Sequence, residues 1–273
     1  MTASPHPTPD QKLRTPSNLR LRMVASVAMI SVASIALYLG GLAFWILAVI
    51  LSLLMLGEWA DLSGATPKER RTAQFALSVP LALMAPPSLI IESRYFFTLG
   101  LLAGAAFFVA IVTHRRQLAG GVVYCGLPVL ALMVLRREDA GLLLALWTLS
   151  LVWATDIGGF FAGRAIGGPK LAPSISPAKT WAGLAGGVAL ATGLAALLHA
   201  QAGLPFRLAA STPLLAVLAQ LGDLYESALK RRAGVKDSGR ILPGHGGVLD
   251  RLDGLVPVAP VALLLVVLPR LQG

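Results

Sequence analysis

Long uncharged apolar runs alternate with short polar segments along the chain after its first 20 residues. The first run, from Met23 to Leu56, holds no charged residue and is interrupted by a Gly40-Gly41 pair. Helices of about 17 to 25 apolar residues cross the hydrocarbon core of a bilayer, whereas the strands of a membrane barrel alternate over roughly ten residues. The pattern therefore predicts helices over residues 22–39, 41–56, 74–91, 96–113, 118–135, 141–160, 181–198, 208–222 and 254–269.

The composition strengthens this interpretation. Of the 273 residues 56% are hydrophobic and 13% are charged, and the mean hydropathy is +0.73. One soluble domain of this size cannot bury so much apolar surface. We therefore predict an all-α polytopic integral membrane protein with about nine transmembrane helices. The Gly40-Gly41 pair leaves open whether 22–56 makes two crossings, a tight hairpin or a re-entrant segment.

The polar segments divide the chain into three predicted parts. Residues 1–21 contain four prolines and few apolar residues, which is typical of a disordered tail, here expected in the cytoplasm. The apolar run that follows is much longer than the core of a signal peptide, so we expect an uncleaved anchor. Residues 22–135 are predicted as N-terminal transmembrane helices, and residues 136–273 as a C-terminal catalytic transmembrane region.

Lys and Arg residues distinguish the two sides of the membrane. With the N-terminus in the cytoplasm, all but five of the 23 Lys and Arg residues fall in the tail and the cytoplasmic loops. The positive-inside rule favours this orientation. Topology and attraction to anionic lipid headgroups then explain the net charge of +10, and we expect no nucleic-acid binding. We predict a cell (inner) membrane protein whose polar active site faces the cytoplasm.

The segment from Ser227 to Asp253 concentrates charge between two apolar runs. With its flanks it holds five of the 13 carboxylates, namely Asp223, Glu226, Asp237, Asp250 and Asp253. Carboxylates at the end of an apolar helix are costly unless they pair with cations or bind metal. The simpler of these interpretations is a set of interfacial salt bridges to Arg231, Arg232 and Arg251.

Basic residues and glycines lie between these acids, including Lys230, Lys236 and the glycines around His245. Glycine lets backbone amides approach an anion, and Lys and Arg neutralise phosphate oxygens. This combination indicates a site for phosphate together with a divalent cation such as Mg²⁺, which carboxylates hold against phosphate oxygens. His245 is a candidate for donating a hydrogen bond or proton, or for acting as a base.

A second polar segment covers residues 155–183. Asp156 lies inside or at the end of an apolar helix, where an ionisable residue is a functional candidate unless it pairs with Arg164. Ser176, Lys179 and Thr180 offer hydroxyls and one cation, which alone are a weak indication of phosphate binding.

The spacing of residues 227–253 resembles the signature of phosphatidate cytidylyltransferases, also called CDP-diacylglycerol synthases. Every defined position of that signature is met, by Ser227, Leu229, Lys230, Arg231, Lys236, Asp237, Gly239, Leu242, Pro243, His245, Gly246, Gly247, Val248, Asp250, Arg251, Leu252 and Asp253. Residues 155–183 resemble the family's upstream polar segment, with departures at Gly159, Phe160, Ala178 and Ala182.

The resemblance implies transfer of the cytidylyl group of CTP to phosphatidate, giving CDP-diacylglycerol and pyrophosphate with Mg²⁺. It implies Asp223 and Asp250 as metal ligands and leaves a second metal ion and a homodimer open. The catalytic residues would be Asp223, Lys236, Asp237, His245, Asp250, Arg251 and Asp253. CTP, phosphatidate and membrane lipid would be the partners, with substrate contacts from Asp156, Ser176, Lys179, Thr180, Ser227, Lys230, Arg231, Gly246 and Gly247.

Three alternatives stay open. A CDP-alcohol phosphotransferase would carry a compact acid-rich motif with a DG pair and further aspartates at helical spacing, and the sequence contains no such cluster. An ion-coupled transporter usually has repeated halves, and no duplication is visible. A catalytically silent member of the family is suggested by the changes at Ala178 and Ala182.

Overall fold

The computed structural model describes residues 16–86, 95–239, 241–242 and 246–270. These residues form ten α-helices, one 3-10 helix and one two-stranded hairpin. The elements are α1 (Pro16–Leu39), α2 (Gly41–Leu62), α3 (Pro67–Leu83), α4 (Tyr95–Thr113), α5 (Arg116–Arg137), α6 (Gly141–Ile166), β1 (Lys170–Ala172), β2 (Ser176–Thr180), α7 (Trp181–Ala202), α8 (Phe206–Arg232), α9 (Leu249–Leu252), α10 (Leu255–Val267) and η1 (Leu268–Arg270).

Each predicted span overlaps one of the long helices α1–α8 and α10. Among the described residues, five helices are long and apolar enough to cross a membrane: α2, α5, α6, α7 and α8. These five helices support the predicted helical membrane protein, while the number of nine crossings stays a prediction. The β1–β2 hairpin is an addition to the predicted all-α fold, with Lys170 paired to Thr180 and Ala172 to Ser176.

Several helices extend beyond the apolar runs that predicted them. α2 continues to Leu62, α6 to Ile166 and α8 to Arg232, and α1 begins at Pro16 within the predicted tail. Charged residues such as Glu, Lys and Arg are good helix formers, so a helix need not end where its apolar run ends. The polar residues of the two predicted polar segments therefore lie partly on rigid helices.

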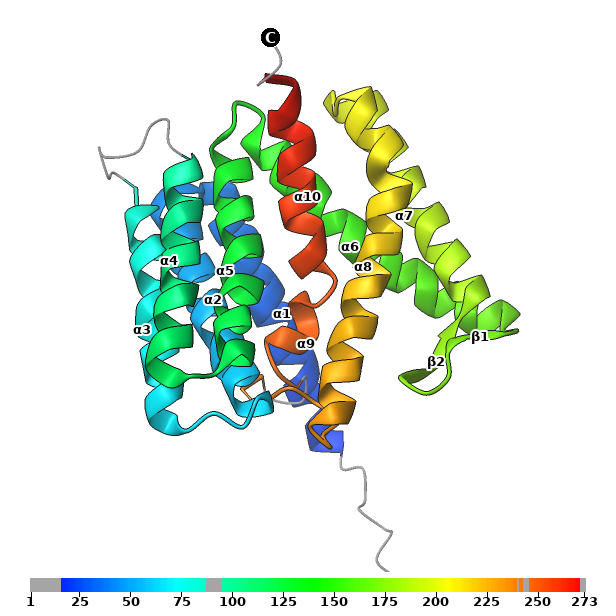
Figure 1. Ribbon diagram of the computed structural model, residues 1–273. Helices are drawn as coiled ribbons and strands as arrows, with labels where there is room; N and C mark the ends of the chain where they lie inside the picture. The colour runs from blue at the N-terminus through cyan, green and yellow to red at the C-terminus, as the bar shows by residue number, and fades with distance from the viewer. Residues whose placement is uncertain (1–15, 87–94, 240, 243–245, 271–273) are drawn as a thin grey trace, which may run out of the picture.

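Two groups of helices flank α10 (Figure 1). Helices α2–α5 form one group, α6–α8 form the other, and α10 packs against both α5 and α8. Helices α6 and α7 approach closely because small residues face each other: a Cβ at Gly186 would lie 2.2 Å from the Cβ of Ala162. Small residues at such an interface let two helix backbones approach closely.

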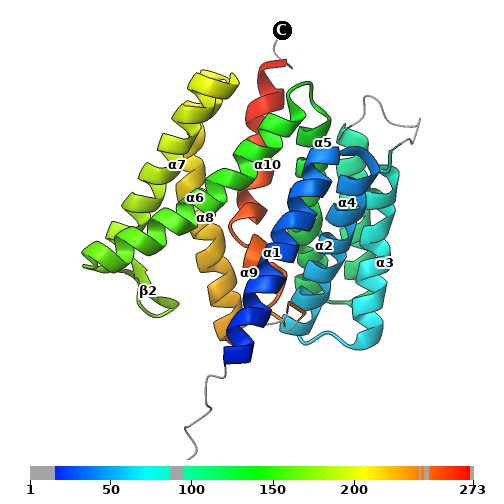
Figure 2. The same ribbon diagram turned by 180° about the vertical axis from the view of Figure 1, so that it is seen from behind.

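A tight turn separates α1 from α2, with positive φ angles of 63° at Gly40 and 49° at Gly41. The guanidinium of Arg136 covers this turn, donating to the carbonyl of Leu37 at 2.9 Å and to that of Tyr38 at 3.1 Å. These bonds satisfy carbonyls at the end of α1 that have no partner within the helix. The two segments are thus separate helices, seen side by side in Figure 2.

The polar elements gather at one end of the molecule. The last turns of α2 and α8, the short helix α9 and the β1–β2 hairpin all lie toward the lower end in Figures 1 and 2. The loops that connect α2 to α3 and α4 to α5 lie at this end too. The fold therefore brings both predicted polar segments to the same end of the helices.

Candidate active site

Helix α8 presents acids and a lysine along one face. Asp223, Ser227 and Lys230 are spaced by three or four residues, so they lie on neighbouring turns. The Ser227 hydroxyl donates to Asp223 at 3.3 Å. Glu226 is 0% exposed, and Lys230 forms a salt bridge to it at 3.4 Å. Because these groups share one helix, the helix itself fixes their relative positions.

Lys179 connects the hairpin to this face. Its ammonium group forms a salt bridge with Asp223 and donates to the side-chain oxygen of Gln220 at 2.9 Å. The amide of Gln220 donates in turn to Asp156 on α6, at 3.4 Å. Gln220 was missed by the sequence analysis because it is uncharged and lies within an apolar run. The network places two predicted residues of the upstream segment, Asp156 and Lys179, beside Asp223.

Asp250 is held from three directions. The Lys230 ammonium donates to its Oδ1 at 2.6 Å, while the backbone N–H groups of Ser238 and Gly247 donate to its Oδ2 at 2.9 and 2.8 Å. Burial acts to raise the pKa of Asp250, but these hydrogen bonds outweigh it and hold that pKa below its ordinary value. Asp250 is therefore an oriented carboxylate. We name Lys179, Asp223, Glu226, Lys230 and Asp250 the acid–lysine cluster.

Gly246 must be small for this arrangement. Its φ is +83°, and a Cβ there would lie 2.9 Å from Oδ2 of Asp250. The neighbouring Asp237 is exposed, and such a Cβ would lie 3.6 Å from the Cβ of Asp237. The predicted residues Gly246 and Gly247 thus contact a carboxylate of the chain itself, and their predicted contact with substrate phosphate stays a prediction.

Asp253 lies next to the cluster. Burial, together with the negative charge of Asp223, raises the pKa of Asp253 above its ordinary value. The backbone N–H of Gly254 donates to its Oδ1 at 2.8 Å. On α8, a Cβ at Gly222 would lie only 2.5 Å from the carbonyl oxygen of Asp253, so a glycine lets α8 approach this segment.

The other predicted residues lie around this centre. Lys236 and Arg251 are exposed, Arg231 lies in the last turn of α8, and Ser176 begins β2. Thr180 is 4% exposed, and its hydroxyl accepts from the N–H of Gly183 at 3.0 Å, capping α7. Its predicted contact with substrate stays a prediction. His245 lies outside the described residues.

Glu58 on α2 was also missed by the sequence analysis. It is buried, and its carboxylate accepts hydrogen bonds from three residues of the signature segment, Ser238, Val248 and Leu249. The rule that made Asp156 a candidate, an ionisable residue at the membrane end of an apolar helix, applies equally to Glu58. The apolar run ends at Leu56, two residues before Glu58, so the hydropathy pattern does not place Glu58 on the helix.

Asp223 and Asp250 offer carboxylate oxygens, the kind of ligand that Mg²⁺ binds. Within the part of the chain that the structure describes, no group of three His, Cys, Asp or Glu side chains is arranged to hold a metal. Mg²⁺, however, usually takes one or two carboxylates and completes its shell with water and substrate phosphate. The buried Glu226 carboxylate lies 3.4 Å from the Lys230 ammonium, which also bonds Asp250, so a second carboxylate stands close to Asp250.

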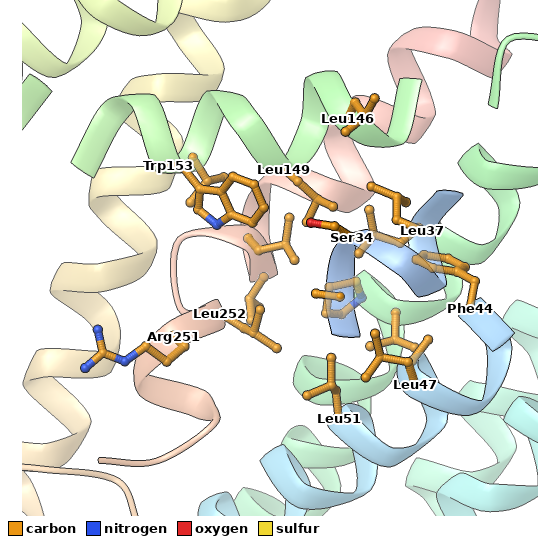
Figure 3. A pocket seen from close by; sticks show the side chains of 18 of the residues that line it. Ser34, Leu37, Phe44, Leu47, Leu51, Leu146, Leu149, Trp153, Arg251 and Leu252 are labelled. Carbon is orange, nitrogen blue, oxygen red and sulfur yellow. The ribbon is translucent and has the colours of Figure 1, made fainter. Parts of the chain in front are cut away.

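An apolar cavity of about 410 Å³ reaches α9, the helix that carries Asp250. Figure 3 shows its lining from α1, α2 and α6, and Arg251 at one edge with its guanidinium pointing away from the apolar side chains. Leu252 of α9 also lines it. Cavities of this size hold small ligands or parts of larger ones. We refer to this space as the apolar cavity; its labelled lining residues include Ser34, Leu37, Phe44, Leu47, Leu51, Leu146, Leu149 and Trp153.

Fold and site together define a helical membrane protein with a charged, polar centre at one end. The sequence model of the cytidylyltransferase family matches residues 20–268 of the chain. The chain is 39% identical over 259 residues to the phosphatidate cytidylyltransferase of Brucella suis biovar 1 (strain 1330), an alignment that covers 91% of this chain and 93% of that protein.

Two further relatives carry the same name. The phosphatidate cytidylyltransferase of Bacillus subtilis (strain 168) is 36% identical over 198 residues, covering 71% of this chain and 68% of that protein. That of Rickettsia prowazekii (strain Madrid E) is 30% identical over 254 residues, covering 89% and 90%. The chain therefore belongs to the cytidylyltransferase family and is a nucleotidyltransferase, which confirms the family that the signature predicted.

Proposed function

We propose that this chain transfers the cytidylyl group of CTP to phosphatidate, forming CDP-diacylglycerol and pyrophosphate for phospholipid biosynthesis. The observation that carries the proposal is the acid–lysine cluster, where residues of β2, α8 and α9 converge at the end of a helical membrane protein of the cytidylyltransferase family. One substrate is a membrane lipid and the other a soluble nucleotide, so a site at the end of membrane helices suits both.

The chemistry requires charge neutralisation more than a general base. An oxygen of the phosphatidate phosphate forms the new bond to the first phosphorus of CTP, and the bond from that phosphorus to pyrophosphate breaks. The attacking oxygen is already ionised, so no proton has to be removed. Both substrates are polyanions, and preorganised cations lower the cost of bringing them together. Lys179 and Lys230, each bonded to an aspartate, are fixed in place for this role.

Magnesium is part of the proposal. Asp223 and Asp250 would hold it, since each retains oxygen lone pairs beyond its hydrogen bonds. An ion held by these residues would supply positive charge near the phosphate oxygens of the substrates. The lysines of the cluster orient both carboxylates through salt bridges. Arg231, Lys236 and Arg251 are cations near the cluster and would contact the phosphates of the substrates.

We further propose that one acyl chain of phosphatidate occupies the apolar cavity. The cavity is lined almost wholly by apolar side chains, and its lining includes Arg251 and Leu252, which follow Asp250 directly on α9. A lipid whose phosphate contacts the cluster would therefore have apolar surface within reach of its chain. Burial of hydrocarbon contributes roughly 0.8 kcal/mol per CH₂ group.

We also propose that the chain crosses the inner membrane nine times and that the cluster lies on the cytoplasmic side. The basic loops between α2 and α3, between α4 and α5, and after α8 lie at the same end as the cluster, in agreement with the positive-inside rule. A cysteine at the exposed position Val235 should react with an impermeant reagent from the cytoplasmic side. Labelling from the outside would invert the proposed orientation.

The direct test is turnover by the purified protein in detergent, supplied with CTP, Mg²⁺ and phosphatidate. We expect CDP-diacylglycerol and pyrophosphate in equal amounts, and no product without Mg²⁺. Folded protein that forms no CDP-diacylglycerol would contradict the proposed function, and would favour a catalytically silent member of the family.

A further inference from the structure

Glu58 joins the N-terminal helices to the signature segment. It lies on α2, is 2% exposed, and accepts three hydrogen bonds across at least 180 positions of sequence. The donors are the hydroxyl of Ser238 at 2.9 Å and the backbone N–H groups of Val248 at 2.9 Å and Leu249 at 2.8 Å. Figure 1 shows α9 beside the end of α2, which agrees with the contacts between these helices.

The signature segment leaves room for this carboxylate. A Cβ at Gly239 would lie 2.4 Å from one oxygen of Glu58, and a Cβ at Gly247 would lie 2.4 Å from the other. These distances are far below a van der Waals contact, so any side chain at either position would displace the carboxylate. Two glycines of the signature are thus explained by a residue of α2 that lies outside it.

The groups that bind Glu58 adjoin the groups that bind Asp250. Ser238 gives its hydroxyl to Glu58 and its backbone N–H to Asp250. Gly247 donates its N–H to Asp250, and the next residue, Val248, donates its N–H to Glu58. A movement of the Glu58 carboxylate would therefore move both backbone segments that orient Asp250.

A buried carboxylate is expensive, which makes its presence here informative. Desolvation of an ionised acid costs several kcal/mol unless hydrogen bonds compensate it. Bonds from backbone N–H and hydroxyl groups to a carboxylate are short and about twice as strong as neutral ones. An apolar residue at position 58 would fill the space without fixing the loop, whereas the carboxylate fixes it at three points.

We propose that Glu58 is a positioning residue for cytidylyl transfer, which holds the signature segment so that Asp250 keeps its orientation toward metal and phosphate. This inference rests on the proposed function. Glu58 itself contacts neither substrate nor metal; it acts through Ser238 and the backbone before Asp250. Partners that orient a metal ligand typically contribute about 10- to 100-fold to metal affinity or activity.

The test compares Glu58→Gln with Asp61→Asn. Glutamine keeps the size of the side chain but places an NH₂ donor against backbone donors, so at least one of the three bonds is lost. Asp61→Asn removes the same charge one turn later on α2. Asp61 pairs with Arg70 at the surface. For Glu58→Gln we expect a decrease in kcat of about 10- to 100-fold or a comparable increase in the Mg²⁺ concentration for half-maximal rate. KM for phosphatidate should stay close to wild type, and Asp61→Asn should match wild type in all three quantities.

Ser238→Ala gives a second, milder variant that leaves the buried carboxylate with both backbone donors. Ser238→Ala should shift kcat or the Mg²⁺ requirement in the same direction as Glu58→Gln, but by less. The variant with both substitutions should lose less activity than the product of the two single losses, because both substitutions break the same hydrogen bond. Unchanged kcat and Mg²⁺ dependence in folded Glu58→Gln would overturn the inference. If Glu58→Gln does not fold, unchanged kcat and Mg²⁺ dependence in Ser238→Ala would by themselves overturn the inference. Absence of turnover in the wild-type protein would instead contradict the proposed function.

Discussion

The acid–lysine cluster and the apolar cavity meet at α9, yet they are built in opposite ways. In the cluster each charged side chain has a specific partner, such as Lys230 with Asp250 at 2.6 Å. The cavity is bounded by apolar side chains of helices α1, α2, α5, α6 and α10, which offer shape and no directional bonds. A change of one atom should therefore matter in the cluster, whereas only a change of volume should matter in the cavity. Selectivity for chemistry and selectivity for chain length would be separable.

The largest effect is expected when a carboxylate of the cluster loses its charge. Asp223→Asn and Asp250→Asn should each lower kcat by at least ~100-fold, because several kcal/mol of transition-state stabilisation depend on charge held at these positions. The exposed Asp139, in the loop between α5 and α6, is a matched control: Asp139→Asn should keep the wild-type rate. Rates are measured at saturating Mg²⁺ with folding checked by thermal denaturation. A near-normal rate in either cluster variant would show that the metal site is wrongly assigned.

The cluster was predictable because charge is conspicuous in an apolar chain. Asp223, Lys230 and Asp250 are polar residues between apolar runs. The structure joins Lys230 to Asp250, and Asp223 lies on the same helix as Lys230. The role of Gln220 and the contacts of Glu58 were not predictable in the same way. Gln220 carries no charge, and the partners of Glu58 lie at least 180 positions away, so only the packing of α2 against α9 reveals its contacts.

The cavity could not be predicted from the sequence at all. Its lining residues Leu37, Leu51 and Leu149 belong to three different helices and look like any other leucine that faces lipid or a neighbouring helix. Apolar periodicity indicates that a segment is a helix, but it does not say which helices leave space between them. The long helices were foreseeable for the opposite reason, since each follows from a local run of apolar residues.

An intermediate effect is expected at the junction between the cluster and the hairpin. Lys179→Met removes the cation that pairs with Asp223 and bonds Gln220, while keeping an unbranched side chain. We expect kcat/KM for CTP to decrease by about 10-fold, since loss of an orienting partner typically has this size. Lys170→Met, an exposed lysine on β1, tests whether any positive charge on the hairpin would do. Equal losses in both variants would mean that Lys179 contributes only to the general field of the hairpin.

The smallest effect is expected in the cavity, and it should depend on the lipid. Leu149→Trp adds volume to a side chain that lines the cavity, so it should exclude part of a long acyl chain while leaving the cluster intact. We expect kcat/KM for a long-chain phosphatidate to decrease roughly fivefold relative to that for a short-chain one, because a mismatch of one or two methylene groups costs about 1 kcal/mol or more. The measurement is the ratio of the two values in the same detergent.

The matched control for the cavity is Leu197→Trp, the same substitution on the exposed face of α7, where the leucine is 56% exposed and does not line the cavity. It should leave the ratio of long-chain to short-chain kcat/KM at its wild-type value. A Leu149→Trp variant that loses activity equally with both lipids would show that the tryptophan disturbs α6 rather than the place of the chain. Unchanged activity with both would show that the acyl chain lies elsewhere, and the cluster would then act on a lipid whose tails stay in the bilayer.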